Sequence, residues 1–373
     1  MGSATFAREA YDRAYTDWVP RQGPATSRGH ETVRTTGKLD PLVDPAEFGL
    51  IRRSLPRFDL LESGMQQLTI GMPMAAETRL DTTGSMGRNV EVALRVLPDT
   101  FDLCAGVLPG FDLQMAIGIF GDYQDQFILC RPQFEMEADK IVHQLTLMVP
   151  EHGGAGNGGE DPHYGLFGAA YLTDARINQY GLKCYDFTIS DEPARTLFNE
   201  NLLIRVFGDT VFDKVAENGH EISRADLPTT NEVVQALLKR AHAFFLEVPS
   251  HHSTHEFWTD AFGHERVVVL PSVELLPQVQ AVIIGLTEGV LELGTVSDYL
   301  EQNGVSARSA DAITRSVANI PIGAQVPLRE GLTLPVKGDV FREKTDLWPV
   351  DPSEVGDVTP VGASASPEGP NWL

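Results

Sequence analysis

The stretch RLDTTGSMGRNV, residues 79–90, decides how this chain folds, because it marks the change from a strand to a helix. It follows the strand-like run MAAETRL (74–80) and leads into the predicted helix GRNVEVALRVLPDTFDLCAGVL (87–108). Asp81, Thr83 and Ser85 occupy alternate positions of the turn. Two explanations stay open at this point. Either Asp81 caps the helix and Ser85 bonds to the backbone, or the three oxygens form a cage for a hard cation.

Strand-like and helix-like segments alternate beyond this turn. The short turn GDYQD (121–125) joins the second and third strands, which predicts a hairpin and an antiparallel strand at the sheet edge. Helices separate the other strands, which favours parallel pairing with helices on both faces. We therefore predict an α/β fold with a doubly wound, mostly parallel six-stranded sheet. The expected strands are 74–80, 113–120, 127–132, 181–189, 242–248 and 266–270, and the later helices are 137–149, 163–178, 231–241, 254–262 and 275–293.

The chain divides into four predicted regions. Residues 1–65 form a polar N-terminal extension, with short helices expected at 7–15 and 45–55. The main domain covers 66–295, and two further helices make 296–337 a helical C-terminal extension. Residues 338–373 contain few apolar groups and are expected to be a disordered acidic tail.

The charge of the chain narrows the classes of partner. Its 373 residues include 52 acidic and 29 basic ones, for a net charge of −23. Phosphates bind to clustered Lys and Arg, so nucleic acid and anionic membrane surfaces are not expected partners. There is no apolar signal core and no run long enough to span a membrane. Three widely spaced cysteines, Cys104, Cys130 and Cys184, do not form a disulfide framework, so we expect a cytoplasmic protein.

A second carboxylate is expected beside Asp81. Doubly wound sheets bind ligands at the carboxyl ends of the strands, where the strand order reverses, and in the order 3-2-1-4-5-6 this lies between strands 1 and 4. Strand 1 ends in Asp81 and strand 4 is followed by Asp191. Together with Thr83 and Ser85 they offer only oxygen ligands, which suit Mg²⁺ or Ca²⁺ and suit zinc poorly.

The glycine-rich loop GGAGNGG (153–159) leads to two more acids, Glu160 and Asp161. Pro162 suits the first position of a helix, which makes Asp161 a natural N-cap. Glu160 is then free to face the same site, directly or through water.

These motifs resemble those of von Willebrand factor type A (VWA) domains. DTTGSM (81–86) is similar to the D-x-[ST]-x-S signature of their metal-ion-dependent adhesion site (MIDAS), and the resemblance covers roughly residues 70 to 290. GDYQD (121–125) and GNGGEDP (156–162) resemble the hemicentin and alpha-kinase-linked subgroup.

The resemblance implies a divalent cation, Mg²⁺ or else Mn²⁺ or Ca²⁺, held by Asp81, Thr83 and Ser85, with Asp191 and a residue of the glycine loop completing the set. Adhesion-type members place a threonine in that loop, whereas this chain has Glu160 and Asp161, so which of the two coordinates stays open. The implied function is an intracellular module that binds a protein partner through an acidic side chain, and not an enzyme.

The charge of the site bears on this function. Asp81 and Asp191 alone would neutralise a divalent ion and leave it able to attract a partner carboxylate. A third carboxylate ligand, from Glu160 or Asp161, would make the site net negative and weaken that attraction.

A metal-dependent phosphohydrolase at the same Asp81-centred site is the alternative function. Haloacid-dehalogenase phosphatases share a similar turn but need a second aspartate two positions after the first, where this chain has Thr83, which cannot act as the acid. The glycine run lacks the Lys-Ser/Thr of a phosphate loop. The histidines of HHSTH (251–255) and His264 lack zinc-site spacing and are expected to be solvated or capping. Asp122 and Asp125 are expected to serve the hairpin turn.

Overall fold

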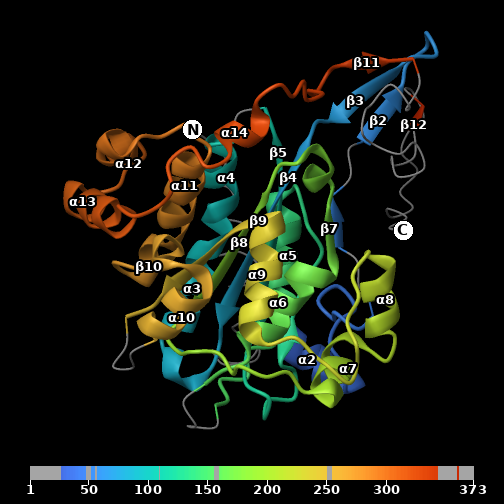
Figure 1. Cartoon of the computed structure of the whole chain (residues 1–373), viewed down its shortest axis with the longest axis vertical. Helices are drawn as coiled ribbons and strands as arrows, with labels where there is room; N and C mark the ends of the chain where they lie inside the picture. The colour runs from blue at the N-terminus through green and yellow to red at the C-terminus, as the bar shows by residue number, and fades with distance from the viewer. Residues whose placement is uncertain are drawn as a thin grey trace.

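The centre of the molecule is a six-stranded sheet in the order β10-β9-β8-β4-β5-β6 (Figure 1). In this computed structural model the described residues are 27–47, 52–54, 57–108, 110–154, 159–249, 254–342 and 359–360. All neighbouring pairs of this sheet are parallel except β5 and β6, which are antiparallel at the edge. The strands are β4 (Pro73–Asp81), β5 (Asp112–Phe120), β6 (Leu129–Cys130), β8 (Cys184–Ser190), β9 (Ala241–Glu247) and β10 (Val267–Val269). The predicted fold class and the adjacency of the first and fourth strands are confirmed.

Helices cover both faces of this sheet. One core contains side chains of α3, α4, α5 and α11, and the other contains side chains of α6, α7, α8, α9 and α10. Strand β9 shows why, because its alternate side chains enter different cores: Phe244 and Leu246 enter the first, and Ala243 and Phe245 enter the second. The helices are α3 (Asn89–Val96), α4 (Thr100–Gly106), α5 (Ala138–Leu147), α6 (Pro162–Tyr171), α7 (Glu200–Phe207), α8 (Val211–Glu217), α9 (Thr230–Arg240), α10 (His255–Phe262) and α11 (Leu276–Thr287).

Two predicted helices are broken in the structure. The helix expected over 87–108 is interrupted by a 3₁₀ turn at Leu97–Asp99, where Pro98 cannot donate a backbone hydrogen bond. The helix expected over 163–178 ends at Tyr171 and is followed by β7 (Thr173–Ala175) and a 3₁₀ segment, Arg176–Tyr180. The cause is a tertiary contact, because β7 pairs in parallel with β1 (Arg52–Ser54).

The same pairing corrects the expected helix at 45–55, of which residues 52–54 are a strand and 45–47 a turn. The expected helix at 7–15 lies outside the described residues.

A second, four-stranded sheet stands at the upper right in Figure 1, with the order β11-β3-β2-β12. The hairpin of β2 (Arg57–Leu60) and β3 (Gln66–Ile70) spans the predicted boundary at residue 65. Two short pieces of the predicted tail, β11 (Val340–Phe341) and β12 (Thr359–Pro360), complete the sheet. The C-terminal extension forms α12 (Val296–Gln302), α13 (Ala307–Ser316) and α14 (Val326–Arg329).

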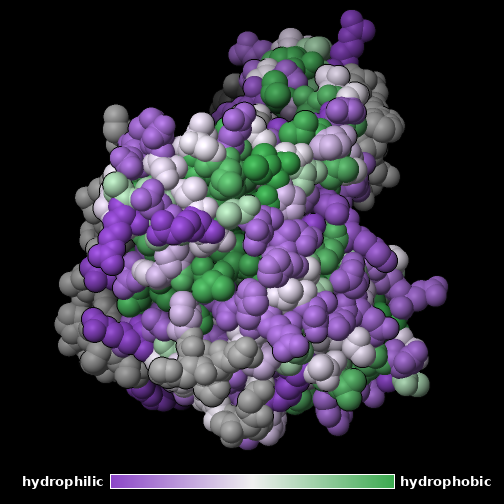
Figure 2. Space-filling view, turned by 60° about the vertical axis from the view of Figure 1, so that its left-hand side comes forward, coloured by the Kyte–Doolittle hydropathy of each residue, from purple (hydrophilic) through white to green (hydrophobic). Residues whose placement is uncertain are grey.

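Figure 2 shows the face to which α12 and α13 belong, where apolar residues occur in several groups separated by hydrophilic ones. Val290, Ile322 and Val326 are among the exposed large apolar side chains. In the described part of the chain, no helix has both the length and the apolar character needed to cross a membrane.

Between the central sheet and α6 lies a buried cluster of four charged side chains: Glu77, Arg79, Arg131 and Asp186. Arg131 donates from Nε to Glu77 Oε1 at 2.7 Å and from Nη2 to Glu77 Oε2 at 2.6 Å. Arg79 donates from Nη1 to Asp186 Oδ2 at 2.9 Å, and the same Nη1 lies 3.2 Å from Glu77 Oε1. Each of the four side chains is almost completely buried. The two acids and two arginines therefore neutralise each other within the protein interior.

Two glycines of α6 make room for this charged cluster. A Cβ added at Gly165 would lie 2.4 Å from Arg79 Cδ, and one added at Gly168 would lie 3.3 Å from Arg131 Nη1. The helix therefore packs directly over the two arginine side chains, and the same strand, β4, carries Asp81 at its carboxyl end.

Candidate metal centre

Asp81 is the last residue of β4 and is fully buried. Its Oδ1 accepts hydrogen bonds from the Thr83 backbone N at 2.8 Å and from Thr83 Oγ1 at 2.6 Å. The following helix, α3, begins after Arg88, which makes no side-chain cap bond. The reading of Asp81 as the cap of this helix is therefore wrong, because Asp81 holds the turn before it.

The carboxyl end of β8 joins the same hydrogen-bonded set. Ser190 donates from its hydroxyl to Asp81 Oδ2, and Ser85 Oγ donates to Asp191 Oδ1 at 2.8 Å. Thr83 Oγ1 and Ser85 Oγ lie 3.1 Å apart. The structure thus brings Asp81, Thr83, Ser85 and Asp191 together, and it adds Ser190, which the sequence motifs did not identify.

Glu160 reaches the site from the glycine loop. Its backbone forms a bridge to the segment after β8, donating to Pro193 O at 3.0 Å and accepting from Arg195 N at 3.1 Å. A Cβ on Gly154 would lie 3.8 Å from both Glu160 Oε1 and the Gly84 N, so Gly154 lies close to the Glu160 carboxylate and to the Asp81 turn.

The Glu160 carboxylate is poorly compensated. It is 7 % exposed, and its Oε2 has no hydrogen-bond partner among the described residues. Burial, followed by the charges of Asp81 and Asp122, raises the pKa of Glu160 to about 9. The side chain is therefore protonated at neutral pH unless a positive charge approaches it.

Asp161 plays a different part from its neighbour. It occupies the N-cap position of α6, as predicted, but makes no cap hydrogen bond. Its Oδ1 lies 2.8 Å from Arg195 Nη1 and 3.7 Å from His163 Nδ1. Burial raises the pKa of Asp161 to about 6, and Arg195 opposes that rise. Burial and Arg195 lower the pKa of His163 to about 3, so this imidazole is neutral.

Arg195 is the principal functional residue that sequence reasoning missed. Its Nη2 lies 2.7 Å from Asp122 Oδ2 and its guanidinium carbon is 4.6 Å from the centre of the Tyr123 ring. Arg195 lies in the loop after β8. Its ion pair with Asp122 ties this loop to the one after β5, and its ion pair with Asp161 ties it to the loop before α6. The available signal was charge balance, because SDEPAR (190–195) holds one arginine beside a predicted cluster of acids.

The turn roles expected for Asp122 and Asp125 are present. Asp122 Oδ1 accepts from Gln124 N at 2.9 Å, and Asp125 Oδ2 accepts from Asp122 N at 2.8 Å. Asp122 is also linked to the candidate site by its ion pair with Arg195. Of the histidine motif, His251 and His252 lie outside the described residues, and His255 Nδ1 lies 2.8 Å from Glu247 Oε2.

The site is short of positive charge. Burial, with a smaller contribution from Asp191, raises the pKa of Asp81 to about 7 against the hydrogen bonds from Ser190 and Thr83. Within the described ranges, no three His, Cys, Asp or Glu side chains converge closely enough to hold a metal ion. A cation at this turn would therefore use the hydroxyl oxygens of Thr83 and Ser85 beside the carboxylates. The unpartnered Glu160 Oε2 and the all-oxygen donor set fit a hard divalent cation.

Removal of the Arg195 charge should loosen this arrangement. In Arg195→Met we expect the free energy of unfolding to fall by about 1–3 kcal/mol, because Asp122 and Asp161 lose their ion pairs. Chemical denaturation measures this change. Arg205→Met is the matched control, since Arg205 donates to the backbone O of Tyr123 in the same turn at 2.9 Å. Equal stability of the two variants would contradict the proposed tethering.

Comparison with known proteins gives weak similarity in structure alone. The chain matches no protein-family model and no curated protein. Proximal thread matrix protein 1 from the mussel byssus, with a zinc-occupied MIDAS motif, aligns at 14% identity over 59% of this chain and 46% of that one, with a TM-score of 0.39. The pilus adhesin SpaC from Lactobacillus rhamnosus GG aligns at 14% identity over 62% and 34%, with a TM-score of 0.37.

A von Willebrand factor type A structure from Catenulispora acidiphila aligns at 12% identity over 60% of this chain and 45% of that one, with a TM-score of 0.33. In all three cases the alignment spans less than half of the other chain. Nothing about function is transferred from such scores, and the fold assignment rests on the strand order and register.

Proposed function

We propose that this chain is a VWA-type protein-binding module that uses a divalent cation at the Asp81 turn to engage an acidic side chain of a protein partner. The observation that supports it is the hydrogen-bonded set Asp81, Thr83, Ser85 and Asp191, which lies at the carboxyl ends of β4 and β8. We also propose that, among VWA domains, the chain is most similar to the hemicentin and alpha-kinase-linked subgroup.

In the proposal the cation is Mg²⁺, Mn²⁺ or Ca²⁺, and it supplies the positive charge that attracts the partner's carboxylate. Asp81 and Asp191 neutralise that charge, and Thr83 and Ser85 add neutral oxygens. Glu160 is the better candidate than Asp161 for a further contact to the cation, made through a bridging water, because Asp161 Oδ1 pairs with Arg195 and no described residue forms an ion pair with Glu160. One oxygen of each carboxylate, Glu160 Oε2 and Asp161 Oδ2, has no hydrogen-bond partner among the described residues.

The proposal favours binding over the phosphohydrolase alternative. Thr83 donates its hydroxyl hydrogen to Asp81 and offers no acid. His163 is buried, with its Nδ1 lacking a hydrogen-bond partner in the described part of the chain. A cytoplasmic location also belongs to the proposal, and the unpaired thiols of Cys104, Cys130 and Cys184 suit a reducing compartment.

The test is calorimetric titration with Mg²⁺ and Mn²⁺. In Ser85→Ala we expect the cation affinity to fall at least about tenfold, or about 1.4 kcal/mol, because one oxygen ligand is lost. Ser297→Ala is the matched control, since Ser297 Oγ lies 3.0 Å from Thr314 Oγ1 in a similar hydroxyl pair within the C-terminal extension.

The partner chemistry is tested on the cation-loaded protein. A short peptide with one exposed glutamate should bind in Mg²⁺ and be released by EDTA. Equal cation affinity of the two serine variants would refute the site. Retention of the peptide in EDTA would refute metal-mediated recognition.

A further inference from the structure

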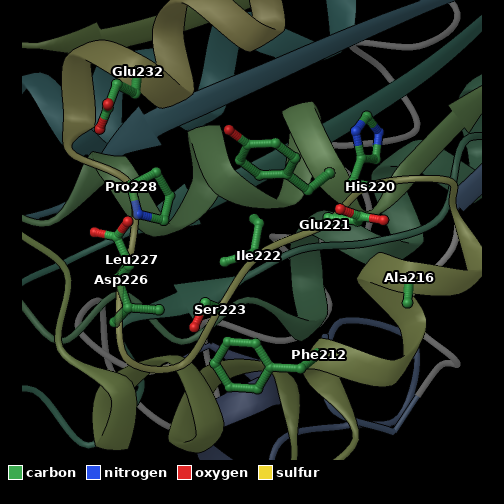
Figure 3. A pocket seen from close by; sticks show the side chains of 11 residues that line it. Phe212, Ala216, His220, Glu221, Ile222, Ser223, Asp226, Leu227, Pro228 and Glu232 are labelled. Carbon is green, nitrogen blue, oxygen red and sulfur yellow. The ribbon is translucent and has the colours of Figure 1, made fainter.

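A second candidate binding site lies between α8, the loop 220–228 and the start of α9. It is a pocket of about 770 Å³, within the range of small-ligand and peptide side-chain pockets. Figure 3 shows His220 and Glu221 on one side, Pro228 and Glu232 on the opposite side, and Ile222 between them. None of its lining residues belongs to the Asp81 site.

Apolar side chains form part of the lining. Phe212, Ile222 and Leu227 are half-buried and contact the second hydrophobic core, which holds them in place. The Phe212 ring already accepts a cation from this chain, because the guanidinium carbon of Arg224 lies 4.8 Å from the ring centre.

The charge of the lining is negative. Three carboxylates, Glu221, Asp226 and Glu232, line the pocket, and the lining contains no Lys or Arg. Among the described residues, the Glu221 and Asp226 side chains have no ion pair or hydrogen-bond partner, and Glu232 is bonded to Thr229 alone. His220 adds no charge at neutral pH, because burial and the neighbouring Arg240 lower its pKa.

We propose that this pocket binds a segment of a partner protein in which basic residues flank an apolar one. The apolar side chain would contact Phe212, Ile222 and Leu227, and the basic side chains would lie beside the carboxylates. Carboxylates on both sides of the pocket favour a ligand with more than one cationic group (Figure 3). Such rim charges chiefly steer association and set specificity.

The test uses the fluorescein-labelled peptide GGRLRGG and the full chain in EDTA, so that the Asp81 site takes no part. We expect binding by fluorescence polarisation that weakens with added salt, because exposed charges are screened. The double variant Glu221→Gln/Asp226→Asn should weaken binding at least about tenfold. Glu217→Gln, an exposed carboxylate of α8 outside the lining, is the matched control and should leave binding unchanged.

Four results would overturn the proposal. The first is absence of binding at millimolar peptide, and the second is equal affinity of the double variant and the wild type. The third is equal affinity for GGRGRGG, which lacks the apolar side chain. If the free diamine putrescine displaces the peptide at equal concentration, the pocket is a small-amine site and the protein-partner assignment is wrong. Unchanged melting temperatures of the variants would show that the fold is intact.

Discussion

The Glu77→Gln variant is expected to unfold about 3–5 kcal/mol more easily than the wild type, because it leaves two buried arginines undercompensated. Glu77 accepts two hydrogen bonds from Arg131 and lies 3.2 Å from Arg79 Nη1. Gln can accept but carries no charge. Denaturation with urea measures the change in the free energy of unfolding.

The same variant should change the acid sensitivity of the protein. Despite the opposing effect of burial, the two arginines lower the pKa of Glu77 from 4.5 to about 2 in the folded protein. A lowered folded pKa contributes stability that is present above the unfolded pKa and is lost as the pH falls. The wild type should therefore lose this contribution between about pH 4.5 and pH 2, and Glu77→Gln should not.

Glu137→Gln is the matched control, because Glu137 forms an exposed i,i+3 ion pair with Lys140 at 3.2 Å. Exposed pairs contribute about 0–1 kcal/mol, so this variant should be nearly as stable as the wild type. Similar losses in both variants would show that the buried cluster has no special importance.

This buried cluster also shows the limit of sequence reasoning about the fold. The run MAAETRL was correctly predicted to be a strand. The alternation with helices and the short hairpin turn predicted the sheet type and its antiparallel edge strand, and the order 3-2-1-4-5-6, assumed from common doubly wound sheets, is the one observed. The burial of Glu77 and Arg79 was not predictable. A strand face with exposed charged side chains and one with buried, paired charges show the same alternation of charged and apolar residues. The pairing depends on Arg131 and Asp186, which lie 54 and 107 residues away from their partners.

The candidate site was predictable to a similar degree. Asp81, Thr83, Ser85 and Asp191 follow from the turn and the strand order, and the structure brings them together. Sequence alone could not separate Glu160 from Asp161, because the two are adjacent. The structure separates them by their contacts, because Asp161 Oδ1 pairs with Arg195, whereas no described residue forms an ion pair with Glu160. Arg195 belongs to no motif and is identified only by its contacts.

The cation site itself is expected to reduce the stability of the cation-free protein, and Glu160 is the residue that tests this. A carboxyl group whose pKa is raised on folding contributes stability below its unfolded pKa, and that contribution is lost as the pH rises. The pKa of Glu160 rises from 4.5 to about 9, so in EDTA the wild type should lose stability from about pH 4.5 toward pH 9.

Glu160→Gln should remove this loss and stabilise the cation-free protein at pH 8 by about 1–2 kcal/mol, a figure reduced for solvent near the site.

With Mg²⁺ or Mn²⁺ present, the order of stability of the wild type and the variants should change. The wild type should gain melting temperature, because a ligand that binds only the folded state stabilises it. Glu160→Gln should gain less, and Asp81→Asn should gain nothing, since Asp81 is the fully buried centre of the set. Melting curves with EDTA and with each cation measure these gains.

Asp161→Asn is the control, because it changes the adjacent carboxylate, which pairs with Arg195. It should leave the gain in melting temperature from the cation largely intact. If Asp161→Asn lost the gain while Glu160→Gln kept it, Asp161 would be the ligand. If Asp81→Asn kept the full gain, the cation would bind elsewhere and the Asp81 turn would be only structural.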